Sequence, residues 1–88
     1  MSPEQLELLS NLLDALDRLF DRECRAIDIL SLVYATHRAL GPSELGQVLQ
    51  TAVIDLERIV KGAREDELER EAALSATNDL RLRLAELV

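Results

Sequence analysis

The residue types that most often carry catalysis occur together in one short segment, which holds Cys24, Asp28 and His37. A thiol, a carboxylate and an imidazole are the parts of a cysteine nucleophile, its base and the group that orients the base. If Cys24 and His37 lie on one helix, they are about 20 Å apart, because a helix rises about 1.5 Å per residue. A nucleophile and its base must approach within about 3 Å. We therefore expect no activity that depends on these side chains.

Metal-binding and phosphate-binding patterns are equally weak. The chain has one histidine, so it contains neither the Glu-x-x-His pairs of di-iron bundles nor a His-Glu-x-x-His motif. Carboxylates four residues apart, such as Glu67 and Glu71, fit a solvated helix face better than a cation site. The three glycines are isolated and form no phosphate-binding loop. The sequence predicts no enzyme, no cofactor and no metal site.

Apolar residues recur at steps of three and four, a spacing that brings them onto one face of an α-helix. The chain has 88 residues, of which 48% are hydrophobic and only two are aromatic, Phe20 and Tyr34. We therefore expect one all-α domain over residues 1–88, with a core of aliphatic side chains. The two clearest series are Leu6, Leu9, Leu13, Leu16 and Phe20, and Leu45, Leu49, Ala52, Leu56 and Ile59.

Four helices are expected, over residues 3–20, 26–40, 44–61 and 65–87. Ser2 and Pro3 are typical of a helix start, and Gly41 followed by Pro42 is typical of a helix end. The second helix is apolar over most of its surface, which predicts the most buried helix. Leu30 and Leu56 lie centrally on their stripes. The expected core positions of the fourth helix are Ala73, Ala76, Leu80, Leu84 and Leu87.

Two architectures are compatible with these helices. In the first, turns near Arg22, Pro42 and Gly62 produce an antiparallel up-down four-helix bundle. In the second, two long helices form a hairpin that dimerises into a four-helix bundle, because the stripes continue in phase through 21–25 and through Ala63. Polar residues in the middle of each half favour the first architecture. Whether 21–25 and 62–66 are turns or continuous helix stays open.

The chain is acidic, with a formal net charge of −7. This charge repels nucleic acid and anionic membrane surfaces, and it favours a basic protein partner. No apolar run approaches the roughly 20 residues needed to span a bilayer. The first residues do not read as a secretory signal, and the single cysteine fits a reducing compartment. We expect a cytoplasmic protein.

Carboxylates gather in two segments of the chain. Residues 65–71 carry five carboxylates in seven positions, and a second group lies near the end of the first helix. Both architectures bring 20–25 and 62–68 to a similar level, so the two groups are expected to share one end of the molecule. Crowded like charges lower stability, so such a cluster can be a binding surface. The candidate partner-binding residues are Asp14, Asp17, Asp21, Glu65, Asp66, Glu67, Glu69 and Glu71.

In size, helicity and acidity the chain resembles the immunity proteins with which bacteria neutralise their own cationic toxins. The resemblance rests on composition and expected architecture. It implies a non-catalytic immunity protein or antitoxin whose acidic side chains occlude a basic toxin, with electrostatic steering to speed capture. The alternative is a homodimeric structural or adaptor protein, in which exposed apolar stripes form the dimer.

Overall fold

A computed structural model describes residues 2–62 and 65–88, and these residues form four α-helices and no β-strand. The all-α prediction is therefore confirmed. Each helix begins and ends within one residue of the position expected from the sequence. The helices are α1 (Pro3–Phe20), α2 (Ala26–Leu40), α3 (Glu44–Lys61) and α4 (Asp66–Leu87).

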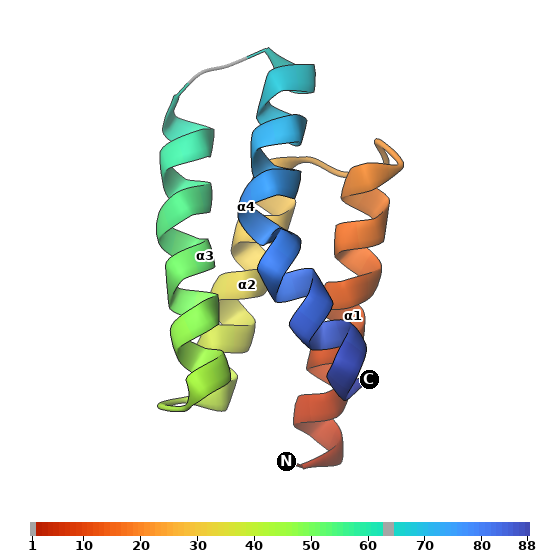
Figure 1. Cartoon of the computed structure of the whole chain (residues 1–88), viewed down its shortest axis with the longest axis vertical. Helices are drawn as coiled ribbons and strands as arrows, with labels where there is room; N and C mark the ends of the chain where they lie inside the picture. Colours follow the sequence, from red (N-terminus) through yellow and green to blue (C-terminus); the bar gives the residue numbers. More distant parts are fainter. Residues whose placement is uncertain (1, 63–64) are drawn as a thin grey trace.

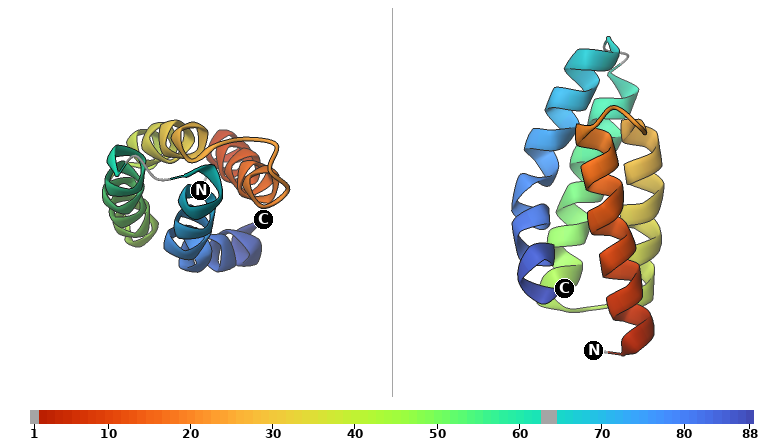
Figure 2. Two further views of the ribbon diagram at one scale, coloured as in Figure 1. Left: turned by 90° about the horizontal axis from the view of Figure 1, so that it is seen from above. Right: turned by 90° about the vertical axis from the view of Figure 1, so that its right-hand side faces the viewer.

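The helices lie side by side along the long axis of the molecule (Figure 1). Seen from above, they surround a common centre in the order α1, α2, α3, α4 (Figure 2), and α4 packs against α1 as well as against α3. The end of α1, the start of α2, the end of α3 and the start of α4 all lie at the upper end in Figure 1. The turn between α2 and α3 lies at the lower end.

Local hydrogen bonds fix the helix ends that the sequence predicts. The Ser2 hydroxyl accepts from the Gln5 amide at 3.2 Å, and the Ser2 amide donates to Gln5 Oε1 at 3.0 Å. α2 ends at Gly41, whose φ of +67° favours glycine. The Ser43 hydroxyl then accepts from the Gly46 amide at 2.9 Å and begins α3.

The chain leaves the helical conformation over residues 21–25. Arg22 has a φ of +65°, a region that residues with a side chain enter at a cost. The continuous first helix that the hairpin architecture needs is therefore contradicted. In the second half, Gly62 caps α3 and Glu65 precedes α4. The predicted continuation of the stripe through Ala63 lies outside the described residues.

The buried stripe of α1 differs from the predicted one. Phe20 is 58% exposed and Leu6 is 37% exposed, while Leu13 is only half-buried. α1 carries leucines in more than one register of three and four, and the register that packs is the one facing α2 and α4. The fully buried residues are Leu9, Leu12, Ala15, Leu16 and Leu19.

The expectation that α2 is the most buried helix is wrong. Ile29 and Val33 are buried, but Ile27 is 48% exposed and Tyr34 is 51% exposed. α2 packs against α1 and α3 and touches α4 to a lesser extent. One apolar face of α2 is therefore left uncovered.

The predicted stripes of α3 and α4 are mostly confirmed. In α3, Leu49, Ala52, Leu56 and Ile59 are buried, and Leu45 packs partly buried against the core. In α4, the predicted positions Ala73, Leu80 and Leu84 are buried, Ala76 is half-buried and Leu87 is exposed. Thr77 is also buried, and its hydroxyl donates to the Ala73 carbonyl at 2.8 Å, which satisfies the buried polar group.

Candidate functional site

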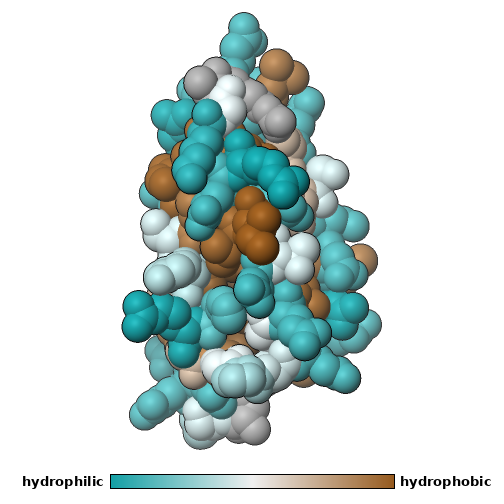
Figure 3. Space-filling model, turned by 90° about the vertical axis from the view of Figure 1, so that its left-hand side faces the viewer, coloured by the Kyte–Doolittle hydropathy of each residue, from teal (hydrophilic) through white to brown (hydrophobic). Residues whose placement is uncertain are grey.

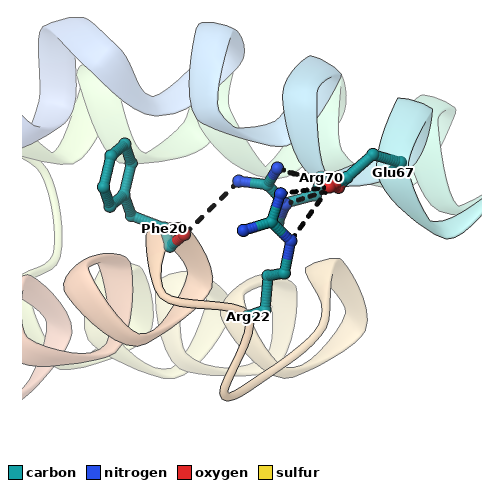
Figure 4. A network of polar contacts seen from close by, with 4 residues as sticks. All are labelled: Phe20, Arg22, Glu67 and Arg70. Atoms are coloured by element: carbon teal, nitrogen blue, oxygen red, sulfur yellow. Dashed lines mark hydrogen bonds and ion pairs between the residues drawn. The ribbon is translucent and has the colours of Figure 1, made fainter.

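The turn 21–25 and the second acidic segment meet at one end of the molecule, as expected, whereas Asp17 pairs with Arg81 in the second half of α4. The turn that follows α1 lies beside the first turns of α4 (Figure 4), where the Arg22 guanidinium donates to Glu67 Oε1 at 3.0 and 2.7 Å. We call this the acidic end, and define it as residues 14–25 and 65–71. It is built by the end of α1, the turn 21–25 and the start of α4.

Glu67 is the centre of a network of charged side chains (Figure 4). It accepts from Arg22 on the turn, and from Arg70 Nη2 at 2.7 Å within α4. Arg70 Nη1 also donates to the Phe20 carbonyl at 3.3 Å. That carbonyl belongs to the last turn of α1, where carbonyl groups lack helical partners and a positive charge is favourable. The network therefore fastens the end of α1 to the start of α4.

Arg25, which immediately precedes α2, makes a second set of contacts with the start of α4. Its Nη2 lies 2.8 Å from Asp66 Oδ1 and 3.4 Å from Glu69 Oε1. The Glu69 side chain is only 10% exposed, so its carboxylate would lose much of its hydration without a cationic partner. The Arg25 amide donates to Asp28 Oδ2 at 2.9 Å and so caps the start of α2.

The guanidinium groups lower the pKa of Glu67 from 4.5 to about 2, chiefly through the hydrogen bond from Arg70 and then through that from Arg22. A folded-state pKa below the unfolded one contributes stability above about pH 4.5, which is lost as the pH falls toward 2. We expect Glu67→Gln to reduce the fall in thermal unfolding midpoint over this pH window. The effect should be small, because the Glu67 side chain is 47% exposed.

The matched control for this prediction is Glu71→Gln. Glu71 is exposed on the same helix and makes no ion pair with another described residue. Its substitution should leave the acid dependence of the unfolding midpoint close to that of the unaltered protein. If the two variants change the acid dependence equally, the arginine contacts of Glu67 are not its cause.

Internal ion pairs divide the eight predicted partner-binding residues into two groups. Asp17 lies 2.8 Å from Arg81 Nη2, and Asp66, Glu67 and Glu69 make the contacts described above. The remaining four are exposed and make no ion pair with another described residue. We call them the outer carboxylates: Asp14, Asp21, Glu65 and Glu71.

The arginines that pair with these carboxylates were not among the residues predicted from the sequence. Arg22 and Arg25 lie within the acidic end itself, and their partners are more than 40 residues away along the chain. The signal that could have found them is the set of arginines interleaved with carboxylates in both segments. With these arginines paired, the outer carboxylates are the predicted residues that keep no ion pair among the described residues.

A small cavity of about 220 Å³ lies beneath the network, with Leu19, Cys24 and Ala26 among its lining residues. The Cys24 thiol lies 3.6 Å from the Ala15 carbonyl. Burial, and then the charge of Asp28, raise the pKa of this thiol, which makes it a poorer nucleophile at neutral pH. The cavity therefore combines a charged rim with a thiol whose pKa is raised.

Cys24 and His37 lie toward opposite ends of α2. Cys24 precedes the helix, and His37 is in its last turn, about 17 Å further along the axis from Ala26 at 1.5 Å per residue. His37 Nδ1 is buried and has no hydrogen-bond partner among the described residues. The described residues contain no group of three or more histidine, cysteine or acidic side chains placed to hold a metal ion.

Comparison with protein-family models, with curated proteins and with solved structures gave no match to this chain. None of the helices within residues 2–62 and 65–88 combines the length and the apolar character needed to cross a membrane. The acidic end therefore forms a charged surface at one end of a helical protein.

Proposed function

We propose that this protein is an antiparallel up-down four-helix bundle that acts in the cytoplasm by binding a basic protein, without catalysis. The role fits an immunity protein or antitoxin that occludes a basic toxin. One observation carries the proposal. The acidic end holds nine carboxylates and four arginines, a net charge of −5 in a chain of −7. Such a concentration of negative charge attracts a basic partner and steers its approach.

The up-down arrangement is supported by the order and direction of the helices. Short connections join α1 to α2 and α2 to α3, and short connections favour antiparallel neighbours. In Figure 1, successive helices run alternately up and down. This arrangement places the end of α1 and the start of α4 together, and so creates the acidic end.

The outer carboxylates are the groups that we expect to contact the partner. A carboxylate held by an internal arginine must lose that contact before it can bind a lysine or arginine of another protein. The outer carboxylates have no such internal competitor among the described residues. The ion pairs made by Arg22, Arg25 and Arg70 then stabilise the conformation of the acidic end, while the outer carboxylates contact the partner.

The proposal is tested by capturing proteins from extracts of the native host on the immobilised chain and measuring association with the captured protein by stopped flow. The test variant neutralises all four outer carboxylates: Asp14→Asn, Asp21→Asn, Glu65→Gln and Glu71→Gln. We expect a captured basic protein whose association rate falls about tenfold with this variant, because exposed charges act mainly on the encounter. The salt dependence of the rate should flatten, and the dissociation rate should change less.

A matched control removes the same charge from the other end of the molecule. It combines Glu4→Gln, Glu7→Gln, Glu44→Gln and Glu86→Gln, all at exposed positions. We expect this control to change the association rate much less than the test variant does. Equal rates for the two variants would contradict the proposed site, and failure to capture any basic protein would contradict the proposed function.

A further inference from the structure

α1 carries a repeat of seven residues that combines apolar and acidic side chains. Seven residues make almost two turns of an α-helix, so residues at this spacing form a row along it. An apolar residue followed directly by a carboxylate occurs three times, as Leu6-Glu7, Leu13-Asp14 and Phe20-Asp21. The apolar row and the carboxylate row therefore run side by side. We call the two rows together the α1 stripe, which is about 21 Å long at 1.5 Å per residue.

The apolar row is most exposed where α1 enters the acidic end. Phe20 is 58% exposed and Leu6 is 37% exposed, whereas Leu13 packs partly buried against the core. In Figure 4 the Phe20 ring extends from α1 on the side away from Arg22 and Glu67. The contacts that fasten α1 to α4 use the Phe20 carbonyl and leave more than half of the residue exposed.

α4 borders the apolar row. Asp17 lies three residues before Phe20, so it belongs to the same row. Asp17 lies 2.8 Å from Arg81 on α4, and Arg70 on α4 donates to the Phe20 carbonyl at 3.3 Å. Both arginines are paired with carboxylates, Arg81 with Asp17 and Arg70 with Glu67. This border therefore presents little net charge.

The carboxylate row faces away from the core. Leu12 and Leu19 are fully buried. Asp14 and Asp21 follow them by two positions, which is about 200° around the helix. Both carboxylates are exposed and make no ion pair with another described residue, although Arg18 lies four residues after Asp14. The α1 stripe thus holds apolar side chains between a nearly neutral border on α4 and an acidic border.

Exposed apolar side chains alone do not single out this surface. They also gather on the side of the molecule on which α3 lies, where hydrophilic side chains border them (Figure 3). Tyr34 on α2 is the other aromatic residue of the chain and is 51% exposed. Its charged neighbour is Arg38, whose guanidinium carbon lies 5.9 Å from the ring centroid. Phe20 differs because the charged residue that follows it in the stripe is a carboxylate.

We infer that the α1 stripe binds a basic amphipathic helix of the partner, with Phe20 and Leu13 as the apolar contacts and Asp14 and Asp21 as the charged ones. This inference rests on the proposed function and names the part of the basic partner that binds. A helix is indicated because rows at a spacing of seven match the apolar row of a second helix lying along α1. Lysines or arginines along one edge of that helix complement the carboxylate row.

The charge of the α1 stripe disfavours other occupants. A second copy of this chain would add its own carboxylate row to the contact, and the stripe contains no basic residue to offset it. An anionic membrane surface would be repelled for the same reason. The apolar row has few members, so a stable contact needs opposite charge on the occupant as well as apolar burial.

Two synthetic helical peptides test this inference with the full chain. The first has leucines on one face and lysines on the other, and the second keeps the lysines but has alanine in place of each leucine. In isothermal titration calorimetry we expect the leucine peptide to bind about tenfold more tightly or better, because only its side chains are large enough to bury Phe20. The binding of both peptides should weaken with salt.

Substitutions of the full chain locate the contact. Phe20→Ala should remove most of the difference between the two peptides, whereas Phe20→Leu keeps an apolar side chain and should retain most of it. Tyr34→Ala is the matched control and should leave both affinities unchanged. Asp14→Asn combined with Asp21→Asn should weaken the binding of both peptides. Circular dichroism should show that every variant stays folded, because all the substituted residues are exposed.

Three results with the peptides would overturn the inference. The first is that the leucine peptide does not bind. The second is that both peptides bind the unaltered chain with equal affinity, which would mean that charge alone drives the contact. The third is that Phe20→Ala and Tyr34→Ala have equal effects, which would mean that the contact is not specific to the α1 stripe.

Rate measurements with the captured host protein separate this inference from the proposed function. Phe20→Ala should raise the dissociation rate and change the association rate less, the reverse of the variant that neutralises the outer carboxylates. If the outer carboxylates control association but Phe20→Ala leaves dissociation unchanged, the proposed function stands and this inference fails. If the leucine peptide binds through Phe20 but the host yields no basic protein, the proposed function fails and the preference of the α1 stripe stands.

Discussion

Replacing Leu56 by alanine is expected to lower the free energy of unfolding by about 2–5 kcal/mol, the range for large-to-small substitutions in packed cores. The Leu56 side chain is fully buried on α3. Its neighbours on the same face, Leu49, Ala52 and Val53, are buried with it. Removing three carbon atoms there leaves a cavity that the surrounding helices fill only in part. Urea denaturation monitored by circular dichroism measures the loss.

The stability loss caused by Leu56→Ala is to be compared with the loss caused by Leu30→Ala. From the sequence, Leu30 and Leu56 are equally central on their stripes, but in the structure Leu30 is only partly buried against the core. We therefore expect Leu30→Ala to cost clearly less than Leu56→Ala when both are measured in dilute solution. Equal losses would mean that Leu30 is packed as tightly as Leu56, contrary to the exposed face of α2.

The sequence could predict the helix ends because their causes are local. Ser2 and Gln5 cap α1 across three residues, and Ser43 and Gly46 do the same for α3. Gly41 permits a positive φ without the penalty that a side chain would bring. Each signal acts within a few residues, so it can be recognised in the sequence without knowledge of the fold.

The buried register of α1 and the buried face of α2 could not be predicted in the same way. α1 has leucines in several registers, so the choice between Phe20 and Leu19 depends on where α2 and α4 lie. α2 is apolar over most of its surface, so its composition does not indicate which apolar residues stay exposed. The helices that contact α2 bury the side that carries Ile29 and Val33, and Ile27 and Tyr34 lie on the opposite side of the helix.

The location of the candidate site was predictable from the sequence, but the ion pairs within it were not. Charge patterning identifies the two acidic segments, and the expected order of the helices brings them to a similar level. The pairing of Arg22 with Glu67 and of Arg25 with Glu69 joins residues 45 and 44 positions apart, which only the packing of α1 against α4 brings together. The same contacts explain a turn that lacks glycine and proline, since the ion pair made by Arg22 helps to hold its positive φ.

Gly41→Ala is expected to destabilise the protein by about 1–3 kcal/mol, because Gly41 has a φ of +67° and a ψ of −160°, a region that is essentially restricted to glycine. A β-carbon at this position would meet no atom within 4 Å. The cost is therefore one of backbone conformation and not of crowding. It falls on the turn that sets α3 beside α2.

Gly62→Ala provides the matched control for this last prediction. Gly62 caps α3 with a φ of −71° and a ψ of −5°, which any residue adopts, so alanine there should be neutral or stabilise by up to about 1 kcal/mol. Both substitutions remove the extra backbone freedom of glycine from the unfolded chain, and less is removed at Gly41 because Pro42 already restricts the residue before it, so most of that contribution cancels when their unfolding free energies are compared. The difference between the two variants then measures the strain of the native backbone at Gly41. If urea denaturation gave the two variants equal stability, the positive φ of Gly41 would not be what fixes this turn.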